Sequence, residues 1–154
     1  APIITFLDTI PIDREGGGLA GLKETLRRLK RGDMVLIFPE GTRTRDGQLQ
    51  SLKPGFCAVA RRAQVPLLPV ALDGAYDAWP RTSPLPRGGR LAVVIGKPIA
   101  AAEVAQFSDE QLVAELARRM EACLAEAQRL RGVTVKPTES PRVAPMPNLT
   151  AKVV

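Results

Sequence analysis

The stretch that decides the fold is MVLIF (residues 34–38), which is followed directly by PEGTR (residues 39–43). Five apolar residues closed by a proline are typical of a short strand that is buried on both faces of a sheet. Such strands belong to α/β proteins, in which ligands bind beyond the carboxyl ends of the strands. The polar turn at 39–43 is therefore the first place to look for a functional site.

Strand-like and helix-like segments alternate on either side of this stretch. Leucines at helical spacing predict a helix over 19–31 that ends at Gly32, and a second helix is expected over 56–63. Two more apolar runs, 65–72 and 91–95, predict buried strands.

The longest helix is expected over 108–131, because Ser108 with Gln111 three residues later has the form of a capping box. The alternation predicts an α/β fold with a mixed, mostly parallel sheet and helices on both faces. Residues 1–131 are expected to form the folded part. Residues 132–154 contain four prolines and little periodicity, which predicts a flexible Pro-rich tail.

The composition is that of a globular domain, with 154 residues of which 45% are hydrophobic. No uncharged apolar stretch is long enough to span a bilayer as a helix. The formal net charge of +6 favours an anionic partner, which could be a phosphate, a lipid headgroup or a nucleic acid. Aromatic residues make up only 4% of the chain, which argues against stacking on single-stranded nucleic acid.

The chain contains no histidine, and this excludes several catalytic classes within it. Ser-His-Asp triads, Cys-His dyads and zinc sites with histidine ligands all need that side chain. The two cysteines, Cys57 and Cys123, are expected to be small buried hydrophobes in a reducing compartment rather than a disulfide.

The turn after the first strand combines three residues that suit a phosphate ligand. Gly41 lets the backbone approach a ligand closely, Thr42 offers a hydroxyl and a backbone N–H, and Arg43 offers a planar fork for a phosphate dianion. Glu40 lies three residues before Arg43. On physical grounds alone, an ordinary turn with a local Glu40–Arg43 pair is an equally good interpretation.

Two further cations are weaker candidates. Arg14 follows a strand-like piece, and Lys53 stands just before an expected helix N-terminus, where anions are favoured. In isolation, each is better explained as a solvated side chain.

Taken together, these stretches resemble the glycerolipid (1-acyl-sn-glycerol-3-phosphate) acyltransferase family. IDR at 12–14 matches the family's second motif, which ends in an arginine after an apolar strand. FPEGTRT at 38–44 matches the third motif except in its last residue, where the family has serine. Lys53 and Gly55 fit the family's usual Lys-x-Gly. VPLLPV at 65–70 matches the fourth motif.

The resemblance covers residues 10–100 and lacks the family's first motif, His-x-x-x-x-Asp, because the chain has no histidine. Family members carry that motif well upstream of the second motif, and only 12 residues precede Asp13 here. We therefore expect an N-terminally truncated chain, the carboxyl-terminal part of the acyltransferase domain, that is inactive alone. One predicted strand should then lack its neighbour and leave apolar side chains bare.

The resemblance implies acyl transfer from acyl-CoA or acyl-carrier protein to the free hydroxyl of lysophosphatidate. The missing histidine would take the proton from that hydroxyl, which attacks the thioester directly. Arg14 and Arg43 would share the acceptor phosphate, together with Lys53. Glu40 would fix the glycerol part or lock Arg43 by pairing with it. The acyl site would be supported by Val65, Pro66, Leu67, Leu68, Pro69 and Val70.

The resemblance implies no metal or other cofactor, because the acyl donor is a co-substrate. It places the protein, expected to be bacterial, at a membrane surface on the cytoplasmic side. A non-catalytic phosphate- or anionic-lipid-binding protein is the alternative from another class. Nucleic-acid binding is not expected. The cations that could serve it are better explained as the solvated face of an amphipathic helix: Lys23, Arg27, Arg28, Lys30 and Arg31.

Overall fold

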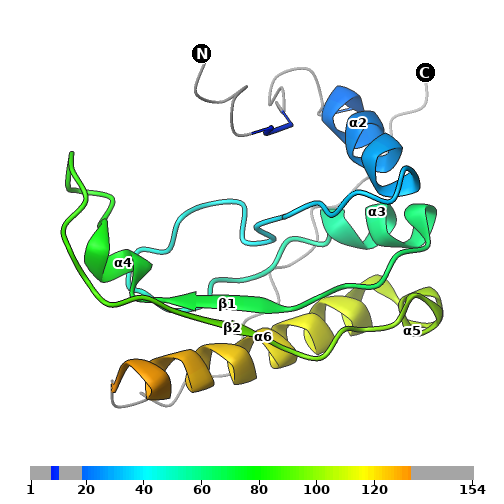
Figure 1. Ribbon diagram of the computed structural model, residues 1–154. Helices are drawn as coiled ribbons and strands as arrows, with labels where there is room; N and C mark the ends of the chain where they lie inside the picture. Colours follow the sequence, from blue (N-terminus) through cyan, green and yellow to red (C-terminus); the bar gives the residue numbers. More distant parts are fainter. Residues whose placement is uncertain (1–7, 11–18, 133–154) are drawn as a thin grey trace, which may run out of the picture.

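The computed structural model describes residues 8–10 and 19–132 of the chain (Figure 1). Arg14 and the expected tail beyond Gly132 lie outside these described residues. In chain order the elements are α2 (Leu19–Lys30), α3 (Gly55–Ala63), β1 (Val70–Asp73), α4 (Ala75–Ala78), β2 (Ala92–Ile95), α5 (Ala101–Gln106) and α6 (Asp109–Arg131).

Helix α6 lies along one face of the two strands and supports them (Figure 1). Its N-terminus is the predicted capping box, since the Gln111 backbone N–H donates to Ser108 Oγ at 3.2 Å and the Ser108 N–H donates to Gln111 Oε1 at 2.9 Å. The helix ends at Gly132, whose φ of 76° is a conformation that glycine adopts without strain. The prediction of a helix over 108–131 is confirmed.

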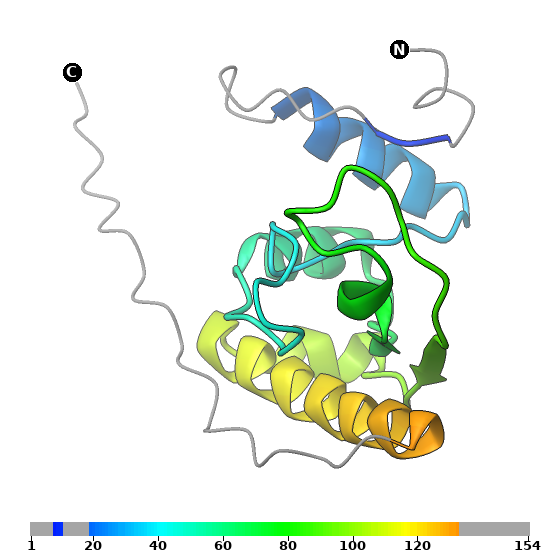
Figure 2. The same ribbon diagram turned by 90° about the vertical axis from the view of Figure 1, so that its left-hand side faces the viewer.

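The other two predicted helices are also confirmed. Helix α2 ends where Gly32 takes a φ of 94° and its N–H donates to the Leu29 carbonyl at 3.0 Å. Helix α3 covers the expected range within one residue and is closed by Gln64 in the left-handed conformation. Helix α3 lies against α2, as the turned view shows (Figure 2). The short helix α5 was not predicted.

The two strands pair antiparallel, with Val70 opposite Ile95 and Asp73 opposite Ala92. The α/β class is confirmed. The sequence predicted a mixed, mostly parallel sheet, whereas the sheet of the described residues is a single antiparallel pair. A parallel return needs a crossover, usually a helix, whereas these strands are joined by the one-turn α4 and a loop. The pairing continues as a bridge between Leu67 and Ile99.

Helix α6 covers one face of this small sheet, and the apolar side chains on the other face are exposed. Ala71 and Asp73 are buried on the face that α6 covers. The alternate side chains Leu72, Val93 and Ile95 are exposed on the other face. Within the described part of the chain, helices therefore cover one face of the sheet and not both.

The main core lies between α3, α5 and the first half of α6, where apolar side chains from all three helices meet. Ile99 and Leu112 are fully buried at its centre. The carboxyl end of α6 is joined to the sheet instead by Arg131, which forms ion pairs with Asp73 and, at 2.9 Å, with Asp77.

The run 34–38, expected to be a buried strand, is the largest correction. It pairs with no strand of the described chain, and four of its apolar side chains are exposed, including Met34 at 92%. A strand is stabilised by a neighbouring strand and by cover on its faces, and within the described residues this run has neither. The expectation that a predicted strand lacks its neighbour because the chain is truncated stays a prediction.

Candidate functional site

The turn after residue 38 is held closed by two backbone hydrogen bonds. The Gly41 N–H donates to the Phe38 carbonyl at 3.0 Å, and the Lys53 N–H donates to the Pro39 carbonyl at 2.8 Å. Gly41 has a φ of 69°, which favours glycine at this position. These bonds bring together the turn at 39–43 and the segment before α3.

Lys53 lies directly across Gly41. A Cβ added at Gly41 would stand 3.0 Å from Lys53 Nζ and 3.1 Å from Cε. The absence of a side chain at Gly41 therefore gives the lysine its place over the turn. Lys53 also stands immediately before Pro54, the N-cap of α3, as the sequence predicted.

Glu40 is fixed from the opposite side of the turn. Its Oε2 accepts a hydrogen bond from the Gln50 backbone N–H at 2.9 Å. Burial of the half-buried carboxyl raises its pKa, and the Gln50 N–H partly offsets this by favouring the charged form. Glu40 Oε1 takes part in no hydrogen bond with a described residue. The expected lock between Glu40 and Arg43 is wrong, because the carboxylate is engaged by Gln50 instead.

A compact loop at 44–50 separates Glu40 from Gln50. Asp46 Oδ1 accepts from the Gln48 backbone N–H at 3.0 Å and from Gln50 Nε2 at 3.1 Å, and these bonds lower the pKa of Asp46. Thr44 Oγ1 accepts from the Gly47 N–H at 3.0 Å. Each of these polar side chains is used within the loop, so the loop gives Gln50 a fixed position.

Two cations at the site are unpaired among the described residues. Arg43 and Lys53 are exposed, and neither side chain forms an ion pair or a hydrogen bond within that part of the chain. Beside them, Glu40 is the acidic side chain of the turn. The arrangement therefore offers positive charge to an anion at the surface.

Comparisons with known proteins identify the family. Residues 1–73 match the family model described as Acyltransferase. The chain is 31% identical over 110 residues to a 1-acyl-sn-glycerol-3-phosphate acyltransferase of Bacillus subtilis. The aligned region covers 71% of this chain and 52% of that protein. It is 38% identical over 127 residues to the Pseudomonas aeruginosa protein of the same name, with coverage of 80% and 47%.

The chain belongs to the acyltransferase family. It spans about half the length of these curated relatives. The crystal structure of the 1-acyl-sn-glycerophosphate acyltransferase PlsC from Thermotoga maritima is similar with a TM-score of 0.62 and 29% identity, over 75% of this chain and 46% of that one. The predicted family and its α/β acyltransferase fold are confirmed.

The fourth-motif run of this acyltransferase chain, 65–70, is hydrogen-bonded to the segment that follows β2 and not to the turn. The Leu67 N–H donates to the Ile99 carbonyl at 3.0 Å, and the Gly96 N–H donates to the Pro69 carbonyl at 2.9 Å. Pro69 is fully buried, while Leu68 is exposed. The role of this run in supporting an acyl chain stays a prediction.

Gln50 is the residue of the site that the sequence reasoning missed. Its backbone N–H orients Glu40, and its side chain closes the 44–50 loop. No motif points to it, because it meets Glu40 only through the folding of the intervening loop. Arg14 lies outside the described residues, so its expected contact with the Arg43 phosphate site stays a prediction.

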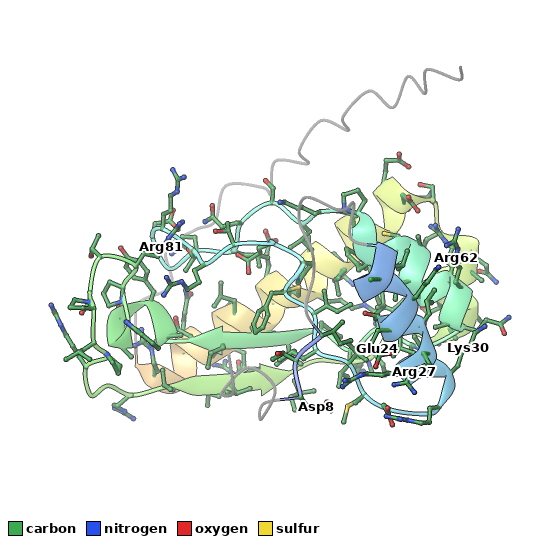
Figure 3. The ribbon with its side chains drawn as sticks, turned by 90° about the horizontal axis from the view of Figure 1, so that it is seen from above. Asp8, Glu24, Arg27, Lys30, Arg62 and Arg81 are labelled. Carbon is green, nitrogen blue, oxygen red and sulfur yellow. The ribbon has the colours of Figure 1, made fainter. Side chains whose placement is uncertain are left out.

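Two of the four cations of α2 pair with neighbouring carboxylates. Glu24 binds both Arg27, at 2.7 Å, and Arg28, at 2.8 Å, and these bonds lower the pKa of Glu24 to about 2 (Figure 3). Arg28 also pairs with Asp8 at 2.8 Å, and Arg31 pairs with Asp33. This pairing supports the interpretation of α2 as a solvated helix face rather than a nucleic-acid interface.

No cluster of potential metal ligands occurs among residues 8–10 and 19–132. A search of the same residues finds no helix with the length and apolarity needed to cross a membrane.

Proposed function

We propose that this chain is the acceptor-binding part of a 1-acyl-sn-glycerol-3-phosphate O-acyltransferase, which esterifies the free hydroxyl of lysophosphatidate. The observation that carries the proposal is the pair of exposed cations, Arg43 and Lys53, around the glycine turn of the FPEGTR motif. The names of the two bacterial relatives support the same reaction.

The phosphate of the acceptor binds Arg43 and Lys53. The guanidinium of Arg43 binds two phosphate oxygens, and the ammonium of Lys53, held over Gly41, adds a point charge. Arg14, the arginine of the second motif, completes the phosphate site.

Glu40 orients the glycerol part of the acceptor. Its Oε2 is held by the Gln50 N–H, which leaves Oε1 to accept a hydrogen bond from a glycerol hydroxyl. Because burial raises the pKa of Glu40, this role requires a pH above that raised value.

The transfer itself is a direct displacement. The acceptor hydroxyl oxygen forms an ester bond to the acyl carbon, the carbon–sulfur bond of the thioester breaks, and the thiol leaves with the proton. Acyl-CoA or acyl-carrier protein supplies the acyl group as a co-substrate, without a metal or other cofactor. General-base help is typically worth about 10²–10⁴-fold, and this chain has no histidine to supply it. The chain therefore binds the acceptor without turning it over.

A binding titration tests this proposal. The 154-residue chain is titrated with a short-chain, soluble lysophosphatidate, and the matched lysophosphatidylcholine serves as the ligand without a phosphate monoester. We expect Arg43→Gln to weaken lysophosphatidate binding by about 10-fold or more, since a hydrogen bond to a charged group contributes about 1.5–3 kcal/mol. The control is Arg62→Gln, which removes another exposed arginine, from α3.

A thiol-release assay with acyl-CoA accompanies the titration and is expected to show no turnover. Equal affinity for the two lysolipids, or equal binding by R43Q and R62Q, would show that Arg43 does not bind phosphate. Turnover at the rate of an intact relative would contradict the role given to the missing histidine.

A further inference from the structure

A loop between α4 and β2 extends from the end of the molecule opposite α2 and α3 (Figure 1). Residues 79–91 contain the single tryptophan of the chain, Trp79, together with Leu85 and Leu91. They also contain three arginines, Arg81, Arg87 and Arg90, and no acidic residue. The loop therefore combines apolar side chains with concentrated positive charge.

The loop is held in shape by its own hydrogen bonds. The Arg87 N–H donates to the Ala78 carbonyl and closes the base of the loop at 2.6 Å. Trp79 Nε1 donates to the Ser83 carbonyl at 3.1 Å, and Ser83 Oγ donates to the Leu85 carbonyl at 2.7 Å. These bonds satisfy the Trp79 indole N–H and the Ser83 hydroxyl inside the loop, so these two groups lose no partner when an apolar medium covers the tip.

The apolar side chains of the loop are nevertheless exposed. Trp79 is 49% exposed and Leu85 is 72% exposed. All three arginines are exposed, and their side chains form no ion pair with any described residue. Nothing in that part of the chain covers the apolar tip or neutralises its charge.

We propose that this loop docks onto an anionic phospholipid bilayer. Trp79 and Leu85 enter the headgroup region, where an indole with an apolar body and a satisfied N–H is favoured. Arg81, Arg87 and Arg90 bind lipid phosphates, because clustered basic residues are attracted to anionic membranes by about 1 kcal/mol each. The exposed aliphatic side chains Leu85 and Leu91, which offer no surface for base stacking, favour a bilayer over a nucleic acid, for which Trp79 is the one aromatic side chain of the loop.

The 79–91 loop begins close to the candidate site, which is where a protein that acts on a lipid would contact the bilayer. Tyr76 of α4, just before the loop, lies against Gly47 of the 44–50 loop, since a Cβ added at Gly47 would stand 3.6 Å from Tyr76 Cδ1. The loop is thus anchored beside the segment that orients Glu40. The inference goes beyond the proposed reaction, because bilayer binding requires neither an acyl donor nor an acceptor.

Because Trp79 is the only tryptophan, its fluorescence reports on this loop alone. The full chain is mixed with vesicles of phosphatidylcholine alone or of phosphatidylcholine and phosphatidylglycerol in equal parts. We expect the emission to shift to shorter wavelength on the anionic vesicles only, and lipids with brominated acyl chains to quench it. Neither measurement depends on catalysis, so failure here and failure of the proposed function are distinguishable.

Charge variants test the role of the arginines. We expect R81Q/R87Q to weaken partitioning into the anionic vesicles by about 30-fold. The matched control is K30Q/R62Q, which removes the same charge from exposed residues at the far end of the molecule (Figure 3). Leu85→Ser should reduce quenching by the brominated lipids while leaving the charge unchanged.

Four results would overturn the proposal. The first is no spectral shift on any vesicle, and the second is an equal shift on neutral and anionic vesicles. The third is equal weakening by the two charge variants, which would mean that net charge and not the loop is responsible. The fourth is a shift caused by an oligonucleotide and not by vesicles, which would assign the loop to nucleic acid.

Discussion

Gly96 shows how a single residue can set the fit between the sheet and its supporting helix. A Cβ added there would stand 2.6 Å from Cys123 Sγ on α6 and 3.1 Å from Pro69 Cγ. Real Cβ atoms do not approach a buried sulfur so closely. The chain therefore needs glycine where the end of β2 crosses α6.

We predict that Gly96→Ala lowers the free energy of unfolding by about 1–3 kcal/mol, because the added methyl group overpacks this contact. Urea denaturation measures the change. Gly88→Ala is the matched control, since a Cβ at Gly88 meets no atom within 4 Å. Equal stability of the two variants would contradict the contact between Gly96 and Cys123.

The cysteines confirm the expectation from the sequence. Cys57 and Cys123 are both free and buried. Burial raises the pKa of the Cys57 thiol to about 11, with smaller contributions from charges nearby, so its reactive thiolate is scarce at neutral pH. Burial also raises the pKa of Cys123.

At the scale of an element, α6 holds the segment before α5 through one carboxylate. Glu115 binds Arg118 at 2.8 Å and Arg119 at 2.7 Å, and these hydrogen bonds lower the pKa of Glu115 to about 2. Arg119 in turn donates to the carbonyls of Lys97 and Pro98, at 3.1 and 2.8 Å. Glu115 therefore orients the arginine that fixes the residues after β2.

This pairing predicts part of the acid sensitivity. A carboxylate whose pKa is lower in the folded state stabilises the fold above its ordinary pKa of 4.5 and loses that contribution as the pH falls toward about 2. We expect Glu115→Gln to reduce stability at neutral pH by about 0.5–1 kcal/mol and to flatten the fall in stability over that pH range. Urea denaturation at a series of pH values measures both effects.

The control for this prediction is Glu121→Gln on the same helix, because Glu121 forms no ion pair among the described residues. An unchanged pH profile in E115Q would mean that the Glu115 cluster does not contribute to acid unfolding.

At the scale of the whole molecule, two apolar surfaces besides the 79–91 loop are uncovered in the described part of the chain. One is the run 34–38, and the other is the sheet face that carries Leu72, Val93 and Ile95. Soluble proteins rarely leave such surfaces bare without a partner. The chain is therefore expected to bind a dye for exposed apolar surface and to self-associate.

We predict that replacing Met34, Leu36 and Phe38 with serine lowers dye binding and self-association by at least half without lowering the melting temperature. These side chains are exposed, so their removal costs little burial. Dye fluorescence and sedimentation measure the change, and Leu130→Ser, at another exposed position on α6, is the control. A large fall in melting temperature in the triple variant would show that the run is covered in solution.

The candidate site was predictable in its parts but not in its contacts. The FPEGTR turn, the glycine with positive φ and the lysine before α3 follow from local sequence. The partner of Glu40 does not, because Gln50 reaches it through a loop whose shape depends on several weak hydrogen bonds. The position of Lys53 over Gly41 also depends on a contact between residues 12 positions apart.

The sequence by itself determined the three longer helices, α2, α3 and α6, and the family. Helix ends depend on residues three or four positions apart, as in the Ser108–Gln111 box and the Gly32 terminus, so local chemistry is sufficient. Only the tertiary structure decided how the apolar runs are used. Strand pairing depends on distant segments, and the same apolar pattern is compatible with the paired β2 and with the bare run 34–38.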